Sequence, residues 1–150
     1  MIAYPDTSFL CALYRQQDNS PQAAAYFKVL PEALHVSGLL LYEFRQSLRF
    51  QVWLHAQDKS KGYPLTDCNR ALADLQTDLD TGAMVLEAPD WLEVHRLAEG
   101  ISKRHTIAGG HRSLDILHVA TALQLGAPEF LTFDSNQRKL AGAEKLRVKP

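Results

Sequence analysis

Short apolar runs alternate along the chain with longer segments in which apolar residues recur every three or four positions. The short runs predict strands at residues 2–5, 34–36, 84–86, 130–133 and 146–148. The longer segments predict helices at residues 8–15, 20–30, 39–56, 66–82, 90–104, 113–126 and 135–142. No hairpin signal joins two strands, so the alternation predicts an α/β fold with a central parallel sheet and helices on both faces.

Polar residues and glycines mark where several of these helices should begin and end. Serine, threonine and aspartate side chains accept hydrogen bonds from the free N–H groups at helix starts. The expected N-caps are Ser20, Thr66 or Asp67, Asp90 and Ser113. Gly82 and Gly126 are expected to end two helices. Residues 107–111 are expected to form a loop that contains two glycines.

The composition of the chain mainly excludes classes of protein. The chain has 150 residues, 46% hydrophobic and 22% charged, so we expect one folded domain over residues 1–150. Cys11 and Cys68 are too few for a disulfide framework. The first residues do not form a signal peptide, and no apolar run reaches the roughly 18 residues of a membrane helix, so we expect a cytoplasmic location and no membrane segment.

Four carboxylates have mostly apolar neighbours. Asp6 and Asp134 directly follow predicted strands, whereas Glu43 and Asp115 lie inside predicted helices. Burying an ionised carboxylate without a partner is costly, and these segments carry no matching set of Lys or Arg. Raised pKa values or a bound cation would relieve that cost, and convergence of several carboxylates favours the cation. Because sites in open parallel sheets form outside the carboxyl ends of strands, we expect the four acids to hold Mg²⁺ or Mn²⁺ there.

Each of these acids also has an ordinary explanation. Asp115 would suit the first turn of any helix because of the helix dipole. Asp134 would suit an N-cap, and Glu43 could lie near a helix surface. A shared ordinary origin for all four, in the order strand end, helix, helix, strand end, is much less plausible.

The sequence resembles the PIN-domain ribonucleases, and among them the VapC-like toxins of bacterial toxin–antitoxin pairs. Four segments carry the resemblance, and together they span essentially the whole chain. They are YPDTSFL at residues 4–10, VS at 36–37 leading to YEF at 42–44, RSLDILHVATA at 112–122, and FLTFDSN at 130–136. Pro5 stands where the family more often has a hydrophobic strand residue, and proline is tolerated at a strand end.

The resemblance implies a three-layer α/β/α fold and a site that binds one or two Mg²⁺ or Mn²⁺ ions. The implied metal-binding and catalytic residues are Asp6, Glu43, Asp115 and Asp134, and the implied supporting residues are Ser8, Thr132 and Asn136. The implied partners are an RNA substrate, a cognate antitoxin and a second copy in a homodimer. Our hypothesis for the chemistry is that metal-activated water hydrolyses an RNA phosphodiester, with the 3′-hydroxyl as the leaving group.

The near-neutral net charge of −1 hides blocks of opposite sign. Residues 71–93 hold six acids and no Lys or Arg, whereas residues 45–70, 94–112 and 135–150 are each net basic. The blocks predict a basic rim around an acidic pocket, with the acidic block on a distant face. The candidate phosphate-binding residues are Arg45, Arg49, Lys103, Arg104, Arg112, Arg138 and His118, which lies one helical turn after Asp115. Trp53 and Trp91 are expected to pack rather than to stack on bases.

Four functions remain open on the sequence, the least favoured of which is a phosphatase or small-molecule enzyme on a similar sheet. The leading hypothesis is a metal-dependent endoribonuclease that acts as the toxin of a VapBC-type pair. The first alternative is a PIN nuclease in RNA processing that has no antitoxin. The second is a non-catalytic PIN-like module that binds RNA or protein, and an EDTA-sensitive cleavage assay separates it from the enzymes.

Overall fold

A computed structural model describes residues 2–150, and within that range five parallel strands form one sheet. The strands are β1 (Ala3–Pro5), β2 (Leu34–Ser37), β3 (Met84–Glu87), β4 (Glu129–Leu131) and β5 (Arg147–Lys149). Their order across the sheet is β3-β2-β1-β4-β5. The parallel α/β architecture predicted from the alternating pattern is therefore confirmed.

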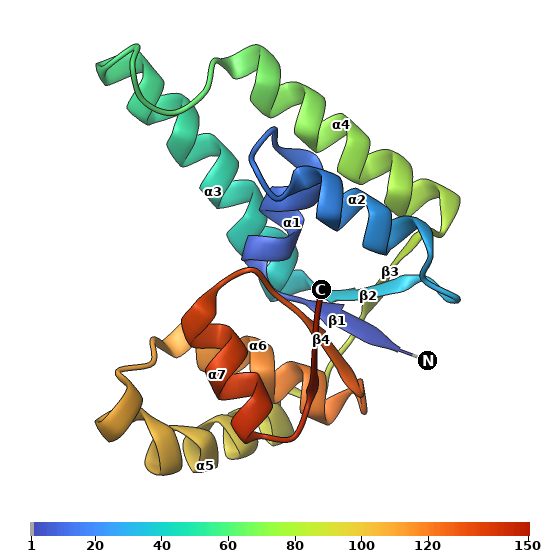
Figure 1. Ribbon diagram of the computed structural model, residues 1–150, viewed down its shortest axis with the longest axis vertical. Coiled ribbons are helices and arrows are strands. Elements are labelled where there is room, and N and C mark those ends of the chain that lie inside the picture. The colour runs from blue at the N-terminus through green and yellow to red at the C-terminus, as the bar shows by residue number, and fades with distance from the viewer. Residues whose placement is uncertain (1) are drawn as a thin grey trace.

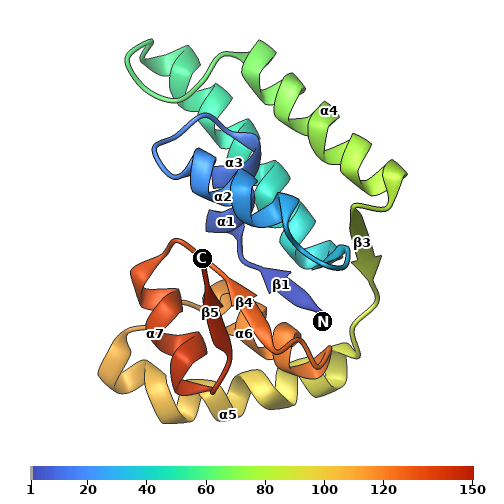
Figure 2. The ribbon, with the colours of Figure 1, turned by 45° about the vertical axis from the view of Figure 1, so that its right-hand side comes forward.

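The helices form two layers, one on each side of the sheet (Figures 1 and 2). The first layer contains α1 (Thr7–Tyr14), α2 (Ser20–Lys28), α3 (Gly38–Gln57) and α4 (Leu65–Thr81). The second contains α5 (Trp91–Gly109), α6 (Ser113–Gln124) and α7 (Ser135–Ala143). The far half of α3 and the start of α4 project beyond the sheet as an arm, which is plain at the top of both views.

Aromatic and aliphatic side chains from both layers bury the sheet. Tyr4, Phe9, Phe44 and Phe130 are among the largest side chains that are fully buried. Helix α6 is apolar nearly all round, as its sequence predicts, and it packs against α5, α7 and β4. Within residues 2–150, no helix is long and apolar enough to cross a membrane.

The sheet reverses its direction of growth between β1 and β4. From β1 the chain adds β2 and β3 on one side, then returns to add β4 and β5 on the other. Pro5 pairs with Leu131 in the register of β1 and β4, and the N–H of Asp6 donates to the carbonyl of Leu131 at 2.9 Å. Ligand sites in open α/β sheets form at such a switch point, outside the carboxyl ends of the strands.

Several predicted helix boundaries are wrong. Ser20 is already helical, and its hydroxyl donates to the carbonyl of Arg15, so it joins two helices instead of capping one. The helix predicted to start at Thr66 or Asp67 begins at Leu65 with Pro64 as its N-cap, and Ser113 follows an N-cap at Arg112. By contrast, Asp90 and Gly82 cap helices as predicted.

Helix α5 runs five residues beyond its predicted end at Arg104, through most of the predicted Gly-Gly loop. Gly109 is its last residue, and Gly110 takes the left-handed conformation at φ 64° that ends it. His105 contributes to this extension, because its ring nitrogen contacts Glu144 at the end of α7 at 2.7 Å. A tertiary contact therefore supports helix where the local sequence favoured a loop.

Candidate metal-binding active site

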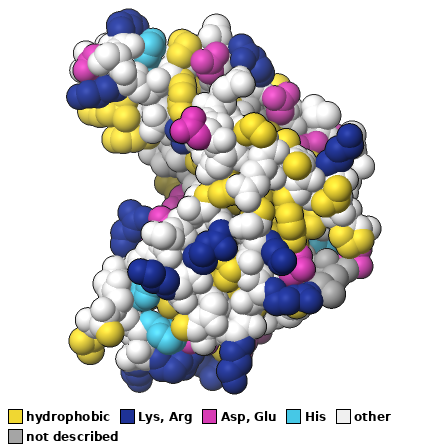
Figure 3. Space-filling model, viewed as in Figure 1, with side chains coloured by type: hydrophobic (Ala, Val, Ile, Leu, Met, Phe, Trp, Pro, Cys, Tyr) yellow, Lys and Arg dark blue, Asp and Glu magenta, His cyan; other side chains and the backbone are white. Residues whose placement is uncertain are grey.

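The four predicted acids line one cavity at the switch point of the sheet. Asp6 follows β1, Asp134 follows β4, Glu43 lies on α3 and Asp115 lies in the first turn of α6. The cavity has a volume of about 180 Å³. Figure 3 shows a notch between the two helical layers with acidic side chains at its floor and Lys and Arg side chains below it.

Asp6 is buried, and the protein surrounds its carboxylate with donors. The Ser8 hydroxyl donates to Oδ1 at 2.6 Å, and the Thr132 hydroxyl donates to Oδ2 at 2.5 Å. The N–H of Phe9 also donates to Oδ1, so Asp6 caps α1. Burial raises the pKa of Asp6, and the hydrogen bonds from Ser8, Thr132 and Phe9 offset that effect only in part.

This raised pKa makes the stability of the metal-free protein depend on pH. The folded protein holds the Asp6 proton more tightly than the unfolded chain does, so Asp6 contributes stability at low pH that is lost as the pH rises through the folded-state pKa. We expect the free energy of unfolding to fall, relative to that of Asp6→Asn, as the pH rises above about 4. Urea unfolding in EDTA at a series of pH values measures this difference. Exposed Asp74 on α4, changed to Asn, is the control, and parallel curves for wild type and Asp6→Asn would contradict the prediction.

Glu43 is held from two sides. Its Oε2 accepts from the Thr7 hydroxyl at 2.5 Å and contacts Nε2 of His118 at hydrogen-bond distance. Partial burial alone would raise the pKa of Glu43, but the hydrogen bonds from His118 and Thr7 outweigh it and hold that pKa below its ordinary value. Burial therefore raises the pKa of Asp6, whereas hydrogen bonding lowers the pKa of Glu43 in the same cavity.

Asp115 and Asp134 retain the ordinary roles that the sequence also allowed. Asp115 is in the first turn of α6, and its Oδ2 accepts from Nε of Arg112 at 3.2 Å. Asp134 caps α7 by accepting from the N–H groups of Asn136 and Gln137. Both acids nevertheless line the cavity, so capping and a place in the site are compatible.

The donor set fits a hard divalent cation, although the carboxylates do not form a ready-made cage. Four carboxylates around one small cavity supply the oxygen ligands that Mg²⁺ and Mn²⁺ prefer. Across the described part of the chain, no three His, Cys, Asp or Glu groups stand close enough together to hold a metal ion. The reason is visible in the contacts above, because protein donors hold the carboxylates of Asp6, Glu43 and Asp134.

The residues expected to support the site contact the acids. Ser8 and Thr132 both hold Asp6, and Thr132 also accepts from the N–H of Asp134 at 3.0 Å. Ser8 accepts from the N–H of Phe133, which ties α1 to the end of β4. Asn136 contributes its backbone N–H to Asp134.

Two cavity residues were missed at the sequence level. Thr7 follows Asp6 and holds Glu43, which the sequence pattern does not reveal because the two residues are distant in the chain. Gln137 lies three residues after Asp134, so helical spacing could have placed it beside the cavity. It is buried, and neither its amide nitrogen nor its amide oxygen has a partner among the described residues. Such a group is available to a ligand or a water molecule.

The structure brings together only some of the candidate phosphate-binding residues. Arg112 lines the cavity with a mostly exposed side chain. His118 also lines it, but its side chain is only 1% exposed, so it is placed to hold Glu43 and not to meet a phosphate directly. Arg138 donates to the carbonyls of Thr132 and Pro150 near the end of β4.

The remaining basic candidates do not line the cavity. Arg104 pairs with Glu144, the C-cap of α7, whereas the cavity lies at the opposite end of that helix. Lys103 lies next to Arg104 and pairs with Glu99 on the surface of α5. Arg45 and Arg49 follow Glu43 on α3.

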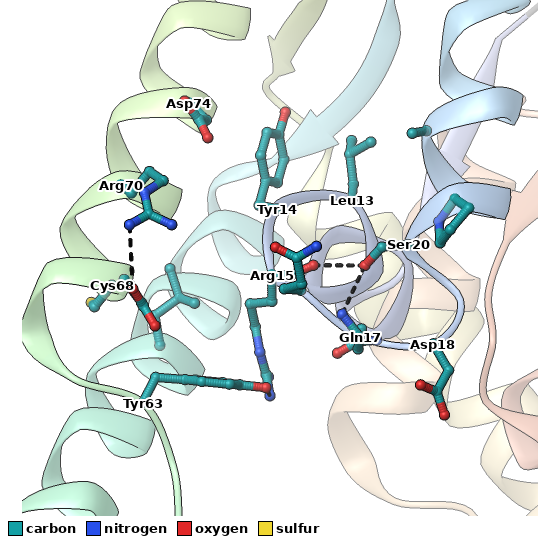
Figure 4. Close-up of a pocket in the computed structure, with 15 residues that line it drawn as sticks. Leu13, Tyr14, Arg15, Gln17, Asp18, Ser20, Tyr63, Cys68, Arg70 and Asp74 are labelled. Carbon is teal, nitrogen blue, oxygen red and sulfur yellow. Dashed lines mark hydrogen bonds and ion pairs between the residues drawn. The ribbon is translucent and has the colours of Figure 1, made fainter.

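A larger cavity of about 660 Å³ lies among α1, α2 and α4 (Figure 4). Three of its lining residues are acids, but Figure 4 shows Asp18 and Asp74 on opposite sides of the cavity. The third acid, Asp67, contacts the guanidinium of Arg70 at 3.4 Å. The smaller cavity is the candidate active site, because it lies at the switch point of the sheet and four carboxylates line it.

Comparisons with known proteins agree with this fold. A family model described as the PIN domain matches residues 3–143. The structure is similar to that of VapC20 from Mycobacterium tuberculosis, a sarcin–ricin loop cleaving toxin, with a TM-score of 0.66, 19% identity and coverage of 99% of both chains. It is also similar to VapBC-1 from nontypeable Haemophilus influenzae, with a TM-score of 0.61, 18% identity and coverage of 99% of this chain and 97% of the other.

A third similar structure is FitAcB from Neisseria gonorrhoeae, with a TM-score of 0.60, 18% identity and coverage of 100% of this chain and 97% of the other. No curated protein matches the sequence at a significant level. The structural similarities, all at low identity, support the fold. The family model covers nearly the whole chain, and the chain belongs to the PIN domain family.

Proposed function

We propose that the protein is a Mg²⁺- or Mn²⁺-dependent endoribonuclease. The observation that carries this proposal is the meeting of Asp6, Glu43, Asp115 and Asp134 at one cavity, at the switch point of a parallel sheet. These four residues would hold the cation. The chemistry that a divalent cation supplies when bound is activation of water and neutralisation of charge on the leaving oxygen.

The chain's own residues prepare this site and orient the substrate. Ser8 and Thr132 fix the Asp6 carboxylate, while His118 and Thr7 fix that of Glu43. Arg112 presents an exposed guanidinium beside the acids, where it can bind a phosphate of the RNA. Hydrolysis would leave a 3′-hydroxyl on one fragment and a 5′-phosphate on the other, without the 2′-hydroxyl as nucleophile.

The biological role we propose is that of the toxin in a VapBC-type pair in the cytoplasm. The similarity over full length to VapC20, and to the structures of VapBC-1 and FitAcB, supports this role. The partners would be RNA, a cognate antitoxin and a second copy of the chain. A small gene immediately upstream that encodes a DNA-binding protein with a disordered tail would support the pairing, whereas its absence would favour a nuclease in RNA processing.

Cleavage of RNA by the purified protein tests the activity. We expect Mg²⁺ to support cleavage and EDTA to abolish it, because charge at the phosphorus and the leaving oxygen must be neutralised. Sequencing of RNA ends after expression, with Asp6→Ala as the matched control, should show 5′-phosphate ends that only the wild type produces. Cleavage that continues in EDTA, or equal ends from the Asp6→Ala protein, would contradict the proposal. A folded wild type that cleaves no RNA would favour the non-catalytic module.

A further inference from the structure

Three large aromatic side chains on α3 are exposed. Tyr42 is 64% exposed, Phe50 is 49% exposed and Trp53 is 55% exposed. We name these three residues the aromatic patch. The expectation that Trp53 packs holds only in part, since its ring lies against Phe50 but more than half of its surface faces solvent. Leaving aromatic rings of this size exposed forgoes the stabilisation that their burial would provide, which makes a binding role worth testing.

Two rings of the patch lie against each other. The ring centroids of Phe50 and Trp53 are 5.5 Å apart, and their planes differ by 24°, which is a stacked arrangement. Stacking limits the rotation of the two rings, and about half of each side chain presents apolar surface to solvent. Such a surface suits a flat ligand that binds by stacking.

The patch lies next to the candidate active site. Phe50 follows Glu43 by seven residues, which is close to two helical turns, so both project from nearly the same side of α3 about 10 Å apart along its axis. Figure 3 shows hydrophobic side chains gathered on the arm where it overhangs the notch that holds the acids. A chain bound in the notch would therefore pass the patch.

The charge around the patch suits a polyanion. From Phe44 to Gln57, α3 carries Arg45 and Arg49 and contains no Asp or Glu. Arg49 is exposed and lies between Tyr42 and Trp53 on the helix surface. Aromatic faces for bases beside arginines for phosphates are the features by which proteins bind single-stranded nucleic acid.

We propose that the aromatic patch is a base-stacking platform that holds unpaired nucleotides of the RNA substrate beside the catalytic cavity. This inference rests on the proposed ribonuclease function and adds to it the surface of this chain that holds the unpaired bases. Bases that are paired within a duplex already stack on their neighbours and cannot lie on the rings, so the platform favours loops and unpaired ends.

Fluorescence of Trp53 tests the platform directly. The chain has two tryptophans, so a Trp91→Phe protein carries Trp53 as its single tryptophan. The probes are a short oligouridine and the duplex it forms with oligoadenosine, both added in EDTA so that binding is measured without cleavage. We expect the oligouridine to quench Trp53 strongly and the duplex to have little effect. No quenching by oligouridine would overturn the proposal.

Affinity provides the second measurement. We expect the double variant Phe50→Ala, Trp53→Ala to bind oligouridine at least about tenfold more weakly, since each stacked base contributes several-fold or more in affinity. Trp91→Ala is the matched control. It removes the second tryptophan of the chain, which lies on α5, and it should bind oligouridine normally. Circular dichroism checks folding, which exposed positions should preserve. Unchanged affinity of the double variant would overturn the proposal.

Two further results separate this inference from its alternatives. If the double variant turns a dimer into a monomer in sedimentation and Trp53 is not quenched by RNA, the patch is a contact between copies of the chain and the platform is wrong. Cleavage in Mg²⁺ is a separate measurement on the wild type. Its absence would count against the ribonuclease, while quenching by oligouridine would still decide the platform.

Discussion

Replacing Asp115 with Asn is expected to lower Mg²⁺-dependent RNA cleavage by about a thousandfold, which corresponds to several kcal/mol of lost transition-state stabilisation. Asparagine keeps the size of the side chain and one oxygen, but it removes the negative charge that we propose holds the cation. The fold should survive, because among residues 2–150 the one hydrogen bond to the Asp115 carboxylate comes from Arg112, whose side chain is 81% exposed. Initial cleavage rates of a labelled RNA at saturating Mg²⁺ measure the effect.

The chain contains a closely matched control. Asp67 is also an acid in the first turn of a helix, and it pairs with Arg70 three residues later, as Arg112 pairs with Asp115 at the same spacing. Each Asn variant should lose about 0.3–1 kcal/mol of helix-dipole stabilisation. Only Asp115→Asn should lose cleavage. Full metal-dependent activity of Asp115→Asn, or equal loss in Asp67→Asn, would show that the acid of α6 is not part of the metal site.

The sheet and the positions of the acids could be predicted because both depend on the local sequence. Alternating apolar periods specify strand and helix in turn, and parallel strands carry the residues at their carboxyl ends to one edge. Asp6 and Asp134 each follow a strand, so their meeting required only the order of the strands. The polar positions Ser8 and Thr132 followed from the resemblance and hold Asp6 in the structure.

What could not be predicted depends on backbone conformation at helix ends and on the placement of segments in space, which the apolar pattern does not specify. Ser113 looks like a cap, but Arg112 takes the extended backbone of the N-cap, and Ser113 begins the helix. Helix α5 continues past its predicted end because His105 contacts Glu144, which is distant in the sequence, and because Gly110, not Gly109, takes the left-handed conformation. The exposure of Trp53 depends on how far the arm of α3 extends beyond the sheet, which periodicity alone does not set.

Replacing His118 with Leu is expected to lower cleavage by about 10- to 100-fold, the usual cost of removing a group that orients a metal ligand. His118 is buried on α6, and its Nε2 holds the Oε2 atom of Glu43. An ionised carboxylate accepts hydrogen bonds, so Nε2 carries the proton, and Nδ1 is left without a partner among residues 2–150. Leucine fills a similar volume, and Glu43 keeps its bond to Thr7 and its contact with water.

His118→Leu should therefore remain folded while the Glu43 carboxylate loses its fixed orientation. We expect weaker Mn²⁺ binding in calorimetry and a lower kcat, whereas a purely structural role would change the unfolding midpoint and leave Mn²⁺ affinity intact. His118→Gln should restore part of both values, because the amide nitrogen of glutamine reaches about as far as Nε2 of histidine. The control is Thr121→Val on the same helix. It also removes a buried polar group, since the Thr121 hydroxyl donates to the carbonyl of Leu117, but it does not remove a contact with Glu43. Wild-type Mn²⁺ affinity and cleavage in His118→Leu would mean that Thr7 alone is enough to orient Glu43.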